Sequence, residues 1–86
     1  MIDIRMYCTA FCPYCVRAEM LLKSKGVEAI NKILIDSIPD GFQDLLHLTG
    51  RRTVPQVFIG DLHIGGFDDL AELDSLDGLE PLLITD

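Results

Sequence analysis

Two cysteines separated by two residues, Cys12 and Cys15, are the part of the sequence best suited to carry out chemistry. If a helix starts at this point, the two thiols can close a disulfide within its first turn. The first thiol then lies beside unpaired backbone N–H groups and the positive end of the helix dipole, both of which favour the thiolate. The pKa of Cys12 is therefore expected to fall below the free-cysteine value of ~8.5. Cys12 is predicted to attack, and Cys15 to resolve the mixed disulfide that results.

The remaining cysteine and the histidines raise the alternative of a metal site. A structural zinc site needs four ligands, and only Cys8, His47 and His63 are left to complete one. Both histidines lie far from the cysteines in the sequence, so surface or packing roles and no bound metal are expected. The C-x3-C-x2-C spacing also matches the cluster motif of radical-SAM enzymes, but 86 residues cannot form their barrel. Cys8 is expected to pack at a strand end, and a minor role in oxidation or glutathionylation stays open.

Length and composition favour one small domain covering residues 1–86, with a modest core. No stretch approaches the ~20 apolar residues that span a bilayer, and Asp3 and Arg5 interrupt the apolar N-terminus, unlike a signal peptide. A cytoplasmic protein without a membrane partner is therefore expected.

The net charge is -7, and residues 53–86 contain no Lys or Arg. The basic surface that nucleic-acid binding requires is absent from this pattern.

The strands that must position these residues follow from alternating apolar residues and turn signals. Strands are expected at residues 2–7, 29–35, 57–59 and 62–64. Gly60-Asp61 is a strong signal for a two-residue hairpin between the last two. Parallel pairing across a right-handed crossover and an antiparallel hairpin together give a mixed sheet.

Helices are expected between these strands. Pro13 opens the first, which ends near Gly26 and carries on its apolar stripe Val16, Ala18, Met20, Leu21 and Leu22. Pro39 opens a second helix. The third follows the glycine pair at 65–66 and ends at residue 78, with Leu70, Leu73 and Leu76 on its apolar side; a short closing helix covers residues 79–83. The predicted fold is α/β and thioredoxin-like, with a four-stranded mixed sheet flanked by helices.

Three motifs in order resemble the dithiol glutaredoxins, most closely the small bacterial ones, and the resemblance covers nearly the whole chain. They are Cys12-Pro13-Tyr14-Cys15, residues 50–55 (GRRTVP) and residues 64–70 (IGGFDDL). The resemblance implies a glutathione-dependent thiol–disulfide oxidoreductase that reduces protein disulfides and protein–glutathione mixed disulfides. Glutathione is then a co-substrate, and no cofactor is permanently bound. The expected partners are disulfide-bonded or glutathionylated proteins, of which ribonucleotide reductase is typical for the family, and the expected state is a monomer.

The resemblance also implies how glutathione is held. The family's proline at position 55 is cis and turns the backbone of Val54 toward the thiols, where its N–H and C=O can pair with a peptide-like substrate. The paired glycines allow close approach of a backbone. Asp68 and Asp69 then stand at a helix start, where carboxylates and N–H groups suit the two charges of a γ-glutamyl group.

One position departs from the family pattern. A lysine commonly stands where this chain has Thr9, and Arg51 or Arg52 is the expected replacement for its charge. Phe11, beside the first cysteine, is expected to form an apolar rim or to pack. The full predicted set of glutathione-binding residues is Tyr14, Arg51, Arg52, Thr53, Val54, Pro55, Gly66, Asp68 and Asp69.

Two other functions within the same fold stay open. A glutaredoxin-like electron donor served by thioredoxin reductase usually lacks the paired acids found at residues 68–69. An iron–sulfur cluster-binding glutaredoxin typically has a single active-site cysteine, or a smaller residue in place of Pro13. The paired acids favour glutathione rather than thioredoxin reductase as the source of electrons. Pro13 together with Cys15 argues against binding of an iron–sulfur cluster.

Overall fold

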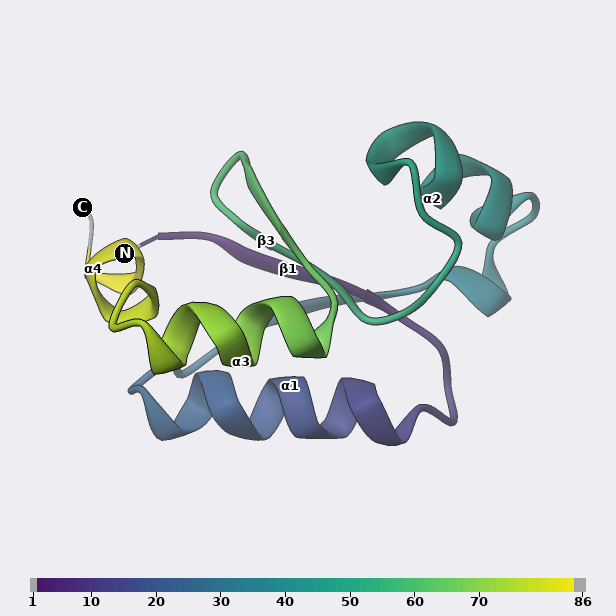
Figure 1. The fold of residues 1–86 in the computed structure, drawn as a ribbon. Helices are drawn as coiled ribbons and strands as arrows, with labels where there is room; N and C mark the ends of the chain where they lie inside the picture. The colour runs from purple at the N-terminus through teal and green to yellow at the C-terminus, as the bar shows by residue number, and fades with distance from the viewer. Residues whose placement is uncertain (1, 85–86) are drawn as a thin grey trace.

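The computed structural model describes residues 2–84 and contains one four-stranded sheet in the order β2-β1-β3-β4 (Figure 1). The inner strands are β1 (Ile4–Cys8) and β3 (Gln56–Ile59), and the outer ones are β2 (Asn31–Leu34) and β4 (Leu62–Gly65). β1 runs parallel to β2 and antiparallel to β3, and β3 and β4 form the expected hairpin. The sheet confirms the predicted α/β, thioredoxin-like fold with a mixed sheet.

Four α-helices flank the sheet: α1 (Pro13–Ser24), α2 (Gly41–Thr49), α3 (Phe67–Ser75) and α4 (Leu79–Leu83). α1 and α3 lie side by side on one side of the strands, and α2 lies on the other (Figure 1). A short 3-10 helix, η1 (Ile35–Ser37), follows β2, so the second strand is shorter than the predicted 29–35. Within residues 2–84, every helix is too short or too polar to cross a membrane.

The alternation of side chains along β1 explains where the main core forms. Ile4, Met6 and Cys8 are buried, whereas Arg5 and Tyr7 point to the other face and are half-buried. Successive strand residues face opposite sides of a sheet, so one apolar set meets α1 and α3. The other buried members of this core are Cys15, Ala18, Leu22, Val57, Ile59, Leu70 and Leu79.

The predicted apolar stripe of α1 is wrong at two positions. Val16 and Met20 are 55% and 66% exposed, and the buried residues are Cys15, Ala18 and Leu22. These three lie at i, i+3 and i+7, which is one face of a helix. Val16 lies one position further round the helix and so faces away from the sheet.

The second helix starts later than predicted. Pro39 lies outside α2, which begins at Gly41 after Asp40 adopts a left-handed conformation at φ 58°. The Gly41 N–H donates to the Ile38 carbonyl at 3.0 Å, closing the turn that follows η1. A Cβ at Gly41 would overlap the backbone carbonyl of Ile35, so glycine permits this close approach.

The third helix ends earlier than predicted. α3 stops at Ser75 rather than at Gly78, because Asp77 adopts a left-handed conformation at φ 59°. Leu76 lies beyond the helix and is 72% exposed, so the prediction that it belongs to the apolar side is wrong. Leu70 is buried and Leu73 packs against the core, as predicted. The closing helix α4 is present as expected.

Candidate active site

The dithiol lies at the start of α1. Cys12 is the N-cap residue in an extended conformation, and Pro13 occupies the first turn, where its missing N–H leaves no bond unmade. The Sγ atom of Cys12 accepts a hydrogen bond from the Cys15 N–H at 3.1 Å, and the two cysteines are joined in a disulfide. Cys15 is only 5% exposed, whereas Cys12 is half-buried. The first sulfur is therefore the accessible one, with a helix N–H directed at it.

The loop before β3 meets the dithiol from the other side. The Val54–Pro55 peptide bond is cis, and the carbonyl oxygen of Val54 lies 4.0 Å from the Sγ of Cys12. Pro55 is buried, and Val54 is half-buried. Within residues 2–84, the Val54 N–H has no hydrogen-bond partner. A buried or half-buried N–H is seldom left unpaired, so this group is available to a bound backbone.

A cavity of about 400 Å³ lies between this loop and the start of α3. All the predicted glutathione-binding residues except Arg52 line it, and Phe67 lines it in addition. The Tyr14 ring lies 6.3 Å from the Phe67 ring, so the two rings bound the cavity next to the dithiol. The structure thus brings together residues from three distant parts of the sequence.

An ion pair forms one wall of this cavity. Arg51 Nη1 donates to Asp69 Oδ2 at 2.7 Å, and the Gly66 N–H donates to the same oxygen at 2.9 Å. The hydrogen bond from Arg51, and then that from Gly66, holds the pKa of Asp69 below its ordinary value. Asp69 therefore caps α3 and orients Arg51 at the same time. Asp68 is exposed and pairs with no residue among 2–84, so its carboxylate is free for a ligand.

The glycine pair before α3 makes this wall compact. Gly65 has φ +118°, a backbone conformation that L residues rarely adopt. A Cβ at this position would overlap the Asp69 carboxylate and lie 3.1 Å from Arg51 Nη1. A Cβ at Gly66 would lie 3.4 Å from the Pro55 carbonyl oxygen. Glycine at position 65 is therefore needed for the ion pair to sit against the backbone.

A second cavity, of about 490 Å³, lies on the other side of the dithiol. Cys8 and Thr9 line it together with both active-site cysteines; Thr9 is uncharged, and Lys32 is the basic residue in the lining. Cys8 is 2% exposed and belongs to the core, as expected for a packed strand-end residue. Burial raises the pKa of its thiol. Cys8 is therefore a packed, protonated thiol at neutral pH.

Two predicted neighbours of the dithiol lie apart from the cavity. Arg52 is exposed and does not line it, so Arg51 is the arginine at the site. Phe11 is 96% exposed, so the packing role is wrong, and the apolar rim stays a prediction. No group of three or more His, Cys, Asp and Glu side chains among residues 2–84 is arranged to hold a metal ion.

The sequence reasoning missed two contributors. Phe67 follows the glycine pair inside the motif at residues 64–70, but it was not among the predicted glutathione-binding residues. Gln56 is fully buried and is hydrogen-bonded to Thr53 and to His63. The available signal was a polar residue at the first position of β3, directly before the apolar residues 57–59.

Comparison with known proteins agrees with this geometry. The sequence model of the family described as Glutaredoxin matches residues 4–64. A glutaredoxin of Neisseria meningitidis serogroup B is 46% identical over 80 residues, covering 93% of this chain and 94% of the relative. Glutaredoxin 3 of Escherichia coli K12 is 46% identical over 83 residues, covering 96% of this chain and 99% of the relative.

Solved structures give the same result. The crystal structure of a buckwheat glutaredoxin–glutathione complex superposes with a TM-score of 0.86 at 36% identity, covering 95% of this chain and 76% of that one. The solution structure of a Brucella melitensis glutaredoxin gives a TM-score of 0.83 at 42% identity, covering 96% and 89%. With its thioredoxin-like sheet and its Cys12–Cys15 pair, the chain belongs to the glutaredoxin family of thiol–disulfide oxidoreductases.

Proposed function

We propose that this protein uses glutathione to reduce protein–glutathione mixed disulfides and protein disulfides through Cys12 and Cys15. One observation carries the proposal. The accessible sulfur of the dithiol lies 4.0 Å from the carbonyl oxygen of Val54, and the cavity that Val54 lines presents its unpaired backbone N–H next to a free carboxylate, at Asp68, and an arginine, at position 51. A thiol tripeptide with charges at both ends has the matching chemistry.

The proposed pose of glutathione follows from these groups. Its cysteine segment is extended and pairs with the N–H and C=O of Val54, as a strand would. The γ-glutamyl ammonium faces the exposed Asp68, and the γ-glutamyl carboxylate faces the N–H groups at the start of α3, where the helix dipole favours an anion. Arg51 offers its remaining N–H groups to the glycine carboxylate in place of the charge that Thr9 lacks. The glutathione complex of the buckwheat relative supports a tripeptide at this site.

The chemistry proceeds by two thiol–disulfide exchanges. The Cys12 thiolate attacks the glutathione sulfur of a mixed disulfide, and the protein substrate leaves as its thiolate. The new Cys12–glutathione disulfide is then attacked by a second glutathione thiolate, which releases oxidised glutathione and regenerates Cys12. For a protein disulfide, the Cys12 thiolate attacks one sulfur of the substrate, and Cys15 then attacks the mixed disulfide on Cys12, which releases the reduced substrate and gives the Cys12–Cys15 disulfide seen in the structure. Two glutathione thiols reduce this disulfide in turn and leave as oxidised glutathione.

The Cys15 N–H assists each of these steps. It is directed at the Cys12 sulfur at 3.1 Å, where it stabilises negative charge on that sulfur as attacking group or leaving group. The buried Cys15 sulfur lacks such exposure to incoming substrates. This difference supports the assignment of Cys12 as the nucleophile and Cys15 as the resolving thiol.

Turnover of a glutathionylated peptide tests the proposal. The assay contains NADPH, glutathione and glutathione reductase, with wild-type protein, Cys12→Ser and Cys15→Ser. We expect activity to vanish in Cys12→Ser and to persist in Cys15→Ser, because only the first exchange is needed for this substrate. An inactive wild type that regains turnover with thioredoxin reductase would replace the proposal with the alternative electron donor. A brown, dimeric protein from anaerobic purification would favour the cluster-binding alternative.

The proposed partners are glutathionylated or disulfide-bonded proteins, ribonucleotide reductase among them, and the proposed location is the cytoplasm. A buried and unpaired Cys8 suits a reducing compartment. Identifying proteins trapped on the Cys15→Ser variant as mixed disulfides tests the partners directly. Recovery of secreted proteins alone would contradict the cytoplasmic location.

A further inference from the structure

A buried amide lies directly behind the loop that faces the dithiol. Gln56 is fully buried in β3, and its Nε2 donates to the Thr53 carbonyl at 3.0 Å and to the Thr53 Oγ1 at 3.2 Å. Its Oε1 lies 2.7 Å from Nε2 of His63 on the neighbouring strand β4. A buried polar side chain of this kind is costly unless its groups are paired. Here both ends of the amide are paired.

The direction of these hydrogen bonds follows from Thr53. A backbone carbonyl only accepts, so the amide nitrogen of Gln56 must face Thr53 and the amide oxygen must face His63. His63 Nε2 therefore carries the proton and donates. Burial, and then the nearby Arg51 charge, lowers the pKa of His63, while Asp69 acts in the opposite sense. The ring is thus neutral at pH 7, and the hydrogen bond selects one tautomer.

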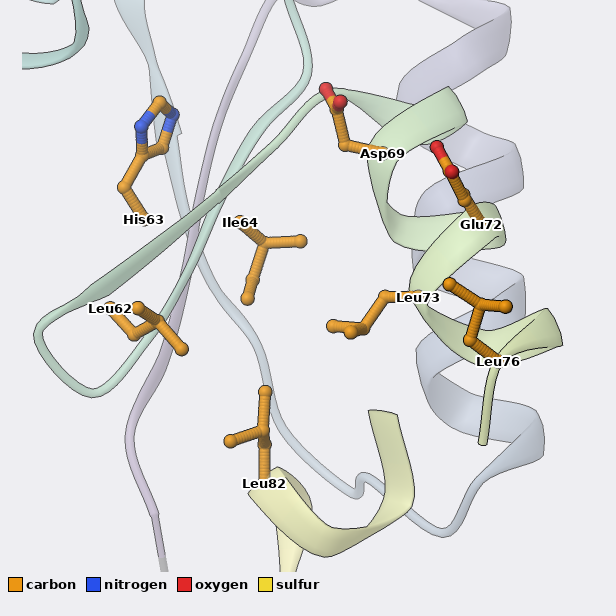
Figure 2. Close-up of a pocket in the computed structure, with 8 residues that line it drawn as sticks. All are labelled: Leu62, His63, Ile64, Asp69, Glu72, Leu73, Leu76 and Leu82. Atoms are coloured by element: carbon orange, nitrogen blue, oxygen red, sulfur yellow. The ribbon is translucent and has the colours of Figure 1, made fainter. Parts of the chain in front are cut away.

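The ring of His63 is itself held by the sheet. It stacks on Phe58 with ring centroids 4.9 Å apart and an interplanar angle of 27°. Phe58 in turn meets the edge of Tyr7 on β1. Figure 2 shows His63 and Asp69 on opposite sides of one end of a cleft of about 310 Å³, with Leu82 at the other end. The His63 ring that donates to Gln56 is therefore held in place by its packing against the sheet.

The loop has few other anchors. Within residues 2–84, the polar contacts of segment 52–54 are those of Thr53 with Gln56 and of the Val54 carbonyl with the Cys12 sulfur. The second of these is a 4.0 Å contact to sulfur, which is a weak acceptor and donor. This segment lies between Arg51, which is hydrogen-bonded to Thr49 and Asp69, and the buried Pro55, and the Gln56 amide is the hydrogen-bond donor that holds its backbone between these two points.

We propose that Gln56 and His63 are positioning residues that fix the backbone of Thr53 and Val54 beside Cys12 and so set the affinity for the substrate backbone. The proposal rests on the function proposed above for the cavity. Neither side chain touches the substrate. His63 fixes the Gln56 amide, Gln56 fixes the Thr53 carbonyl, and the Val54 N–H and C=O follow.

The test removes the N–H donor of His63 and keeps an aromatic ring at this position. His63→Phe retains stacking on Phe58 but leaves the Gln56 Oε1 without a donor. His47→Phe is the matched control, because His47 contacts Gln43 at 3.2 Å on the exposed surface of α2. His63→Gln returns an N–H donor at similar reach. The measurements are kcat and KM for a glutathionylated peptide, and NMR order parameters of the Thr53 and Val54 amides.

We expect His63→Phe to raise KM by about three- to tenfold, the equivalent of one lost hydrogen bond, with kcat changed by less than about twofold. The order parameters of the Thr53 and Val54 amides fall, His47→Phe behaves as wild type, and His63→Gln recovers most of the affinity. If His63→Phe folds poorly in a urea titration, Gln56→Met replaces it. Methionine keeps the volume and removes both polar groups, so the same rise in KM is expected.

Two results would overturn the inference while leaving the proposed function intact: equal KM and order parameters in His63→Phe and His47→Phe, or no recovery in His63→Gln. A wild type that fails to turn over the glutathionylated peptide would instead overturn the proposed function. In that case the order parameters by themselves test whether Gln56 and His63 position the loop. Unchanged values in His63→Phe reject it, and lowered values with recovery in His63→Gln support it.

Discussion

Replacing Gly65 with alanine tests whether the backbone before α3 holds the Arg51–Asp69 ion pair. Gly65 has φ +118°, and a Cβ there would overlap the Asp69 carboxylate. The variant therefore combines an unfavourable backbone conformation with displacement of Asp69. Gly26→Ala is the matched control, because Gly26 has φ +96° but no atom within 4 Å of an added Cβ.

The two costs can be separated in magnitude. A left-handed conformation costs an L residue about 1–2 kcal/mol, and both variants carry this cost. Moving Asp69 also removes its hydrogen bond with the Gly66 N–H, a capping contact worth about 1 kcal/mol. The exposed pair with Arg51 adds less than about 1 kcal/mol. We expect Gly65→Ala to lose about 2–4 kcal/mol and Gly26→Ala about 1–2 kcal/mol.

Urea unfolding of the reduced proteins measures these free energies, and the same samples give KM for the glutathionylated peptide. We expect KM to rise in Gly65→Ala, since the cavity wall moves, and to stay at the wild-type value in Gly26→Ala. Equal losses of stability in the two variants, with KM unchanged in both, would refute the close approach of Gly65 to Asp69.

Three further predictions concern charge and thiol reactivity. Arg51→Ala is expected to raise KM for the glutathionylated peptide about three- to tenfold, whereas Arg52→Ala, outside the cavity, leaves it unchanged; equal effects would contradict this assignment. The pKa of Asp69 is held below 3.8, so its stabilisation is present above that pH and lost as the pH falls. Asp69→Asn should therefore flatten the fall in unfolding free energy as the pH drops below about 4, and an unchanged slope would count against the ion pair. Iodoacetamide at neutral pH should modify Cys12 rapidly and Cys8 only after unfolding, because burial raises the pKa of the Cys8 thiol; peptide mapping showing early Cys8 modification would contradict this.

Structural features that depend on residues close together in the sequence could be predicted from it. The start of α1 follows from Pro13, which fits only the first turn of a helix, and the β3–β4 hairpin follows from Gly60-Asp61. The placement of Cys12 at the helix N-cap is a consequence of the same local rule. These features depend on backbone preferences that act over a few residues.

Structural features that depend on tertiary packing could not be predicted in the same way. Val16 and Cys15 are adjacent in α1, and only the direction in which the helix faces the sheet decides that one is exposed and the other buried. The choice between Arg51 and Arg52 likewise depends on which side chain points toward Asp69, 18 positions further along the chain. The pairing of Gln56 with His63 depends on the register of two strands.

The most direct test of the central claim is the mass of the Cys15→Ser variant after incubation with oxidised glutathione. If the more accessible sulfur at the start of α1 is the nucleophile, the variant gains one glutathionyl group, and peptide mapping finds it on Cys12. A variant that gains no glutathionyl group, or carries it on Cys8, would contradict the assignment of Cys12 as the thiol that exchanges with glutathione.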